Sequence, residues 1–86
     1  MAQLIFTNGK TAEVSPKNGT DFQLEELQEF VGGHIEIVYL RDGRMMIVNE
    51  EGKLRALPIN REATVLYGAL DVITGNALVC ERDEVR

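Results

Sequence analysis

Residues Val31 to Asn60, VGGHIEIVYLRDGRMMIVNEEGKLRALPIN, decide the expected fold. The double glycine ends a helix, and the residues after it alternate in a way that predicts a strand from His34 to Leu40. The Arg41-Asp42-Gly43 corner predicts a turn, and Arg44 to Asn49 the returning strand. The segment therefore predicts a long β-hairpin at about residues 34–49, placed in the middle of a sheet.

The chain before this hairpin predicts a smaller hairpin and a helix. Gln3 to Thr7 is expected to be a strand, and Asn8-Gly9 a tight turn because both residues tolerate a positive φ. Thr11 to Val14 would return along it as an edge strand. Thr20 is the expected helix N-cap, with Gln23 placed to reach back to it.

The expected first helix has one apolar face. Leu24, Leu27 and Val31 recur at helical spacing with Phe30 beside them. Three glutamates are expected on the other sides of the helix: Glu25, Glu26 and Glu29. One face of the central hairpin is expected to pack against this helix, and a neighbouring element or another subunit to cover part of the second face.

After the hairpin, Asn60 is the expected N-cap of a helix from Arg61 to Tyr67, with Ala63, Leu66 and Tyr67 on its inner side. Strands are predicted at Leu70–Ile73 and Ala77–Cys80, and the charged tail 81–86 is expected to fray. The whole chain, 1–86, is expected to be a single α+β domain. Its architecture would be a mostly antiparallel sheet of four to six strands with two short helices.

The composition restricts the function classes. The chain has 86 residues and a single cysteine, Cys80, so an intramolecular disulfide cannot form. A small domain with one thiol and no disulfide is typical of the reducing cytoplasm. No apolar run approaches the roughly 20 residues that span a membrane. We therefore expect a cytoplasmic protein with no membrane partner.

Charge divides the chain into three parts. The net charge is −5, but residues 41–61 carry five basic and three acidic residues, for a net charge of +2. We refer to this part as the basic island. Four of its side chains are candidate phosphate contacts: Arg41, Arg44, Lys53 and Arg55. An ordinary solvated hairpin is the favoured alternative, because acidic segments flank the island and no aromatic residues are interleaved with its cations.

A set of spaced residues resembles a known bacterial family. The set comprises Val31-Gly32-Gly33, Ile35-Glu36, Asn49 to Leu54, Leu57-Pro58, Asn60, Ala63-Thr64, Ile73, Gly75-Asn76 and Leu78-Val79. In their order and spacing these residues are similar to the family catalogued as domain of unknown function 3846. The resemblance implies a small single-domain bacterial protein, in some members an accessory product of a plasmid, phage-like or conjugative element. It carries over no catalytic residues.

The residues that could carry chemistry are few. His34 is the only histidine, and with Glu36 alone it falls short of the three or four ligands of a metal site. Cys80 follows an apolar run, where a cysteine usually packs as a small buried residue. Glu50 and Glu51 lie in a turn that is expected to be solvated. We assign no catalytic residue, metal or cofactor.

The most distinctive polar set surrounds the expected second helix. Its members are candidate ligand or partner contacts: Asn60, Arg61, Thr64 and Tyr67. The competing interpretation is structural, with Asn60 as an N-cap and Thr64 bonded to a local carbonyl.

The favoured function is a non-catalytic binding protein that contacts an unknown protein or a second copy of itself, as a homodimer. We expect self-association through an exposed apolar strand face or edge. Val38, Leu40, Met46 and Val48 motivate this hypothesis, because they place apolar surface on one face of the hairpin. The alternatives are nucleic-acid association through the basic island, and a small enzyme or ligand binder that uses Asn60 and Thr64.

Overall fold

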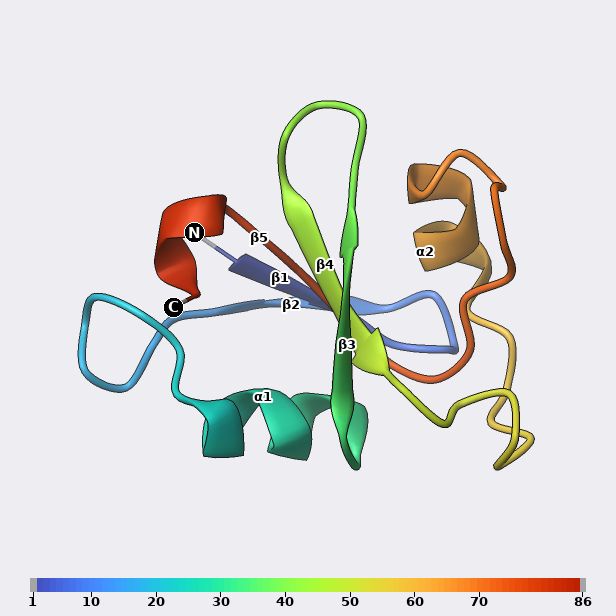
Figure 1. Cartoon of the computed structure of the whole chain (residues 1–86), viewed down its shortest axis with the longest axis horizontal. Helices are drawn as coiled ribbons and strands as arrows, with labels where there is room; N and C mark the ends of the chain where they lie inside the picture. The colour runs from blue at the N-terminus through green and yellow to red at the C-terminus, as the bar shows by residue number, and fades with distance from the viewer. Residues whose placement is uncertain (1, 86) are drawn as a thin grey trace.

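The computed structural model describes residues 2–85 and shows an antiparallel sheet with α-helices against both of its faces (Figure 1). The α+β class and the strand number agree with the prediction. The strands are β1 Ala2–Ile5, β2 Thr11–Val14, β3 Ile35–Tyr39, β4 Met45–Asn49 and β5 Ala77–Cys80. They lie in the order β2-β1-β5-β4-β3, and every neighbouring pair is antiparallel.

The predicted central position of the 34–49 segment is wrong, because β5 occupies the middle of the sheet. All four residues of β5 are apolar and buried, as expected for a strand with neighbours on both sides. In β3 no residue is fully buried, and Glu36 interrupts the apolar pattern. β3 pairs with β4 along one side and forms an edge of the sheet.

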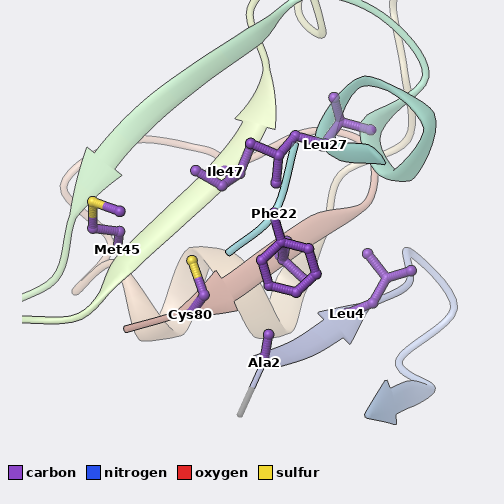
Figure 2. Packing of buried hydrophobic residues seen from close by; sticks show 9 residues of the cluster. Ala2, Leu4, Phe22, Leu27, Met45, Ile47 and Cys80 are labelled. Carbon is purple, nitrogen blue, oxygen red and sulfur yellow. The ribbon is translucent and has the colours of Figure 1, made fainter. Parts of the chain in front are cut away.

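The first face of the sheet packs against α1, Leu24–Val31. The side chains of this core point toward one another between the strands and the helix (Figure 2). The buried cluster consists of Ala2, Leu4, Phe22, Leu27, Val31, Met45, Ile47, Leu78 and Cys80. The Phe22 and Phe30 rings meet edge to face, with their centroids 5.9 Å apart. This geometry is one that aromatic pairs prefer.

Helix α1 begins later than predicted, with Gln23 rather than Thr20 as its N-cap. The Asn18 side chain accepts hydrogen bonds from the backbone N–H groups of Thr20 and Asp21, at 2.9 and 3.0 Å. Phe22 then donates its N–H to the Glu84 carbonyl and forms an isolated parallel bridge with Val85. These contacts hold residues 20–22 outside the helix.

Leu24 was predicted to be buried and Glu26 to be exposed, and the structure shows the reverse. Leu24 is 53% exposed, whereas Glu26 is 6% exposed. The Glu26 carboxylate accepts hydrogen bonds from the N–H groups of Gln23 and Lys17, at 2.8 and 3.0 Å. It thus fastens the segment before the helix to the first turn of α1.

We expect Glu26→Gln to reduce the dependence of stability on acidity. The two backbone hydrogen bonds, from Gln23 first and then Lys17, hold the pKa of Glu26 below its ordinary value of 4.5. A carboxyl group with a lowered pKa stabilises the fold above that ordinary value, and this contribution is lost as the pH falls through the lowered one.

Thermal unfolding between about pH 7 and about pH 3 tests this prediction. Glu26→Gln should lose less of its melting temperature on acidification than the unmodified chain. Glu25→Gln is the matched control, because Glu25 is exposed on the same helical turn. Equal pH dependence in all three proteins would contradict the assignment.

The second face of the sheet is covered by α2, Arg61–Leu66, and by the loop that follows it. Its buried cluster consists of Ile5, Leu40, Met46, Val48, Ala63, Ile73, Ala77 and Val79, with Val38 and Tyr67 packed against it. Asn60 is the N-cap of α2, as predicted, and accepts a hydrogen bond from the Ala63 N–H. Leu66, expected on the inner side, is instead 41% exposed.

Two segments before and after β5 differ from the prediction. Residues 70–73 form a loop instead of a strand, because Ala69 has a φ of 56° and the backbone of Ile73 bonds with Asn60 and Thr64. The charged tail was predicted to fray. Instead, Arg82–Glu84 form a 3₁₀ helix, η1, and Val85 packs against the first core cluster. Arg86 lies outside the described residues.

Candidate functional site

The outer edge of β3 presents backbone groups that no strand within residues 2–85 pairs with. Leu40 donates its N–H to the Arg44 carbonyl, and Glu50 donates to the His34 carbonyl. In an antiparallel pair, hydrogen-bonded and non-bonded positions alternate along a strand. The even-numbered residues of this strand therefore face β4, and the N–H and C=O groups of Ile35, Ile37 and Tyr39 face outward.

The same three residues carry the apolar side chains of this edge. They lie on the α1 face, where Ile37 pairs with Ile47 and Tyr39 with Met45. Ile37 is 36% exposed and Tyr39 58% exposed. The Arg82 guanidinium lies 5.0 Å from the centroid of the Tyr39 ring, and its Nε donates to the Gly43 carbonyl. η1 therefore supports one side of the edge.

The other edge of the sheet, β2, is less suited to accept a strand. It has four residues, and both Thr11 and Glu13 are exposed on it. Pro16 follows two residues later and has no N–H to donate. Short strands, charges and prolines are devices that discourage pairing at sheet edges. β3 also carries one exposed charge, Glu36, but it is one residue longer and no proline lies near either of its ends, so the two edges differ in their capacity to pair.

A groove of about 410 Å³ lies on the opposite side of β3, between the sheet and the loop before β5. Its apolar surface comes from Val38, Val48, Leu54, Val72 and Ile73. Its polar boundary contains Glu36, Glu50, Lys53, Tyr67, Asp71 and Thr74. Glu36 and Val38 belong both to the groove and to β3. The edge and the groove therefore form one continuous surface.

The ion pair between Lys53 and Asp71 connects the two sides of this groove. Lys53 Nζ and Asp71 Oδ2 are 2.6 Å apart, and both side chains are largely exposed. The Lys53 hydrogen bond, followed by that of the Val72 N–H, lowers the pKa of Asp71. Because both partners are exposed, the pair contributes little to stability. With Lys53 paired, the excess charge of the groove is that of Glu36 and Glu50.

The structure separates the four predicted partner contacts. Asn60 is fully buried, and its side chain bonds with Ala63, Ile5 and Gly75. The Thr64 hydroxyl donates to the Asn60 carbonyl and accepts from the Ile73 N–H. These two residues thus hold the fold together.

Tyr67 and Arg61 lie in different hollows. Tyr67 lines the groove described above, whereas Arg61 lies beside Thr7, Asn8 and Gly9 in a hollow of about 380 Å³. Their contact with a ligand or partner stays a prediction.

The candidate phosphate contacts lie toward the two ends of the β3–β4 pair. Arg41 lies beside Gly68, and Arg44 forms a 2.8 Å ion pair with Asp42. At the other end, Arg55 donates to the Gly32 carbonyl and Lys53 pairs with Asp71. A five-residue strand separates the two ends by roughly 17 Å. Nucleic-acid contact by these residues also stays a prediction.

The residues considered for chemistry are dispersed. His34 is exposed, and Glu50 lines the groove without Glu51. Within residues 2–85, no group of three or more histidine, cysteine, aspartate or glutamate side chains could hold a metal ion. In the same range no helix has the length and apolar character needed to cross a membrane.

Cys80 is expected to be unreactive in the folded protein. It is 1% exposed, and burial, followed by the nearby Glu84 and Glu81 charges, raises the pKa of its thiol to about 11. Because the thiolate is the nucleophile, a thiol reagent at pH 8 should react about 100-fold more slowly with the native than with the denatured chain. With a reagent that releases a coloured product when it reacts with a thiol, absorbance measures the rates for the native and the denatured chain. Equal rates would show that β5 opens readily.

Comparison with known proteins gives one result for the whole chain. A model of the family described as domain of unknown function (DUF3846) matches residues 1–86. The chain belongs to this family. The match assigns no function to it. No curated protein and no solved structure matches the chain. The resemblance expected from the spaced residues is thus confirmed.

The apolar hairpin face that motivated the predicted association is not exposed, because Leu40, Met46 and Val48 are buried in the second core cluster. Association through a strand edge was predicted without the residues of that edge, and the groove was not predicted from the sequence. The groove combines residues of β3, the turn after β4, the end of α2 and the loop before β5. Local patterns do not show which of these segments meet. The edge had one detectable signal, since β3 contains an exposed glutamate and β5 contains only apolar residues.

Proposed function

We propose that this protein is a non-catalytic interaction protein that binds an extended segment along the free edge of β3. The observation that carries the proposal is the outward-facing backbone of Ile35, Ile37 and Tyr39. A docking strand would complete their hydrogen bonds, and its side chains would alternate between the Ile37–Tyr39 surface and the groove. Addition of a strand to an exposed sheet edge is a recurring mode of peptide recognition.

The surroundings of the edge support binding rather than catalysis. Ile37 and Tyr39 offer exposed apolar surface, and the outward N–H and C=O groups beside them can bond with an added strand. The family resemblance adds the proposed setting, which is the cytoplasm of a bacterium and an accessory role in a mobile element.

Capture experiments with matched variants test this function. Tagged chain would be incubated with lysate of cells that encode it, in parallel with and without nuclease. Ile37→Pro should remove binding, because its lost N–H faces outward and the β3–β4 bonds remain. Val65→Lys is the control, since Val65 is 74% exposed on α2 and lies outside both β3 and the groove.

The expected result is a partner retained by the unmodified chain and by Val65→Lys but lost by Ile37→Pro. Circular dichroism would establish that the variants are folded. If the Ile37→Pro variant retains the partner as well as the unmodified chain does, the β3 edge is not the binding site. Material that disappears with nuclease, and is lost with charge-reversed Arg41 and Arg44, would favour the nucleic-acid alternative instead.

A further inference from the structure

From the pattern of residues on β3, we infer that the edge of this strand binds β3 of a second copy of the chain. The two strands would run antiparallel about a two-fold axis at Ile37, which joins the two five-stranded sheets into one. This inference rests on the proposed function, because it names the segment that occupies the edge. An interface of this kind is isologous, so the same residues must complement themselves.

Backbone complementarity follows from the positions of the outward groups. With Ile37 opposite its own counterpart, Ile35 lies opposite Tyr39 of the second copy, and Tyr39 opposite Ile35. These three pairs contain only residues whose N–H and C=O groups face outward. Each pair can therefore exchange two hydrogen bonds, and all the outward groups of β3 gain partners.

Side-chain complementarity favours the same register. On the α1 face, Ile37 meets Ile37, and Ile35 meets Tyr39, and apolar cross-strand pairs of this kind stabilise sheets. On the groove face, Glu36 lies opposite Val38 of the second copy. The two glutamates are then diagonal neighbours about 7–8 Å apart and do not lie directly opposite each other.

Shifting the strands by two residues loses these advantages. A two-fold axis at Glu36 places the two Glu36 carboxylates directly opposite each other, which is destabilising for like charges. An axis at Val38 places Ile35 opposite Arg41, which lies outside β3 in the turn. Only the register centred on Ile37 pairs Ile35, Ile37 and Tyr39 among themselves.

The charge of the chain predicts how the dimer responds to salt. Each copy has a net charge of −5, so the two copies repel each other. Added salt screens this repulsion and should strengthen the dimer. Binding to nucleic-acid phosphate has the opposite dependence, because salt weakens it.

Sedimentation equilibrium tests the association from about 1 μM to about 1 mM, a range that includes the affinities of small interfaces. The apparent mass should double across this range, at lower concentrations in high salt. Ile37→Lys should weaken association by about tenfold or more, because charges on an edge strand oppose pairing. Val65→Lys, on α2 and away from β3 and the groove, should leave it unchanged.

Cysteine cross-linking tests the register. Ile37→Cys should form a disulfide-linked dimer on mild oxidation, because facing Cα atoms about 5.5 Å apart lie within disulfide range. Glu36→Cys alone should cross-link poorly, whereas a mixture of Glu36→Cys and Val38→Cys should cross-link readily. Efficient linkage of Glu36→Cys to itself would overturn the register.

The outcomes separate this inference from the proposed function. If the chain stays monomeric up to about 1 mM, the inference that a second copy binds the β3 edge is overturned. If Ile37→Pro still abolishes capture of another protein, the edge remains the binding site and its partner is different. A dimer that Val65→Lys disrupts and Ile37→Lys does not would place the interface away from β3. That result would contradict the inference.

Discussion

Replacing Asn60 with alanine is expected to lower the free energy of unfolding by about 3 kcal/mol, more than a surface substitution would. The side chain is fully buried and takes part in three hydrogen bonds. It accepts from the Ala63 N–H at 3.1 Å, and donates to the Ile5 carbonyl at 3.0 Å and to the Gly75 carbonyl at 2.9 Å. Alanine would leave all three backbone groups without this partner.

Each of these losses has a typical magnitude. Removing an asparagine N-cap costs about 1 kcal/mol. An unsatisfied buried carbonyl costs about 1–3 kcal/mol, so the bonds to Ile5 and Gly75 dominate the total. For a domain of this size, a loss of 3 kcal/mol corresponds to a fall in melting temperature of roughly 12–24 °C. Urea denaturation and thermal melting measure the two quantities.

Asn60→Asp separates the cap from the other two bonds. Aspartate keeps an oxygen that can accept from Ala63, and it is as good an N-cap as asparagine. It cannot donate, however, and it would place a carboxylate against the carbonyl oxygens of Ile5 and Gly75. We therefore expect Asn60→Asp to destabilise the chain at least as much as Asn60→Ala. Near-normal stability of Asn60→Asp would show that capping alone is the role of Asn60.

Asn8→Ala provides the control for loss of an asparagine. Asn8 is exposed in the β1–β2 turn, where its side chain accepts from the Lys10 N–H. A change of about 0.5 kcal/mol or less is expected for such a surface site.

Local signals predicted the parts of the fold that depend on neighbouring residues. Asn60 and Gly32 are examples: the first caps α2 and the second ends α1 with a φ of 78°. β5 was predicted at its observed position because a run of four apolar residues follows a glycine turn. In each case the deciding contacts lie within a few residues along the chain.

The parts that could not be predicted depend on residues far apart in the sequence. Phe22 is kept out of α1 by its bridge with Val85, and Ile73 bonds with Asn60 and Thr64. Neither contact leaves a local pattern. The central position of β5 follows from its pairing with both β1 and β4, and this pairing makes β3 an edge. The candidate site could not be located without that order.

Gly52→Ala is expected to destabilise the chain by about 2 kcal/mol, within the range for overpacking a buried position. Gly52 is buried in the turn after β4. A Cβ there would collide with Thr74 Oγ1 and lie 3.1 Å from the Thr74 carbonyl oxygen. The backbone of Thr74 has little freedom to withdraw, since it forms a bridge with Ile59.

The double variant Gly52→Ala/Thr74→Ala tests this steric cause. Removing the Thr74 hydroxyl should restore part of the lost stability, with the remaining deficit due to the nearby carbonyl oxygen. Chemical denaturation of both single variants and the double variant gives the coupling energy.

Gly43→Ala serves as the comparison for a glycine substitution without a collision. Gly43 has a φ of 93°, but a Cβ there would meet no atom within 4 Å. Its substitution is expected to cost about 1–2 kcal/mol through backbone strain alone, and Thr74→Ala should not relieve that cost. Equal rescue of both glycine variants would contradict the proposed contact. Because Thr74 lines the groove beside β3, its close contact with Gly52 also fixes how near the turn after β4 approaches this side of the candidate site.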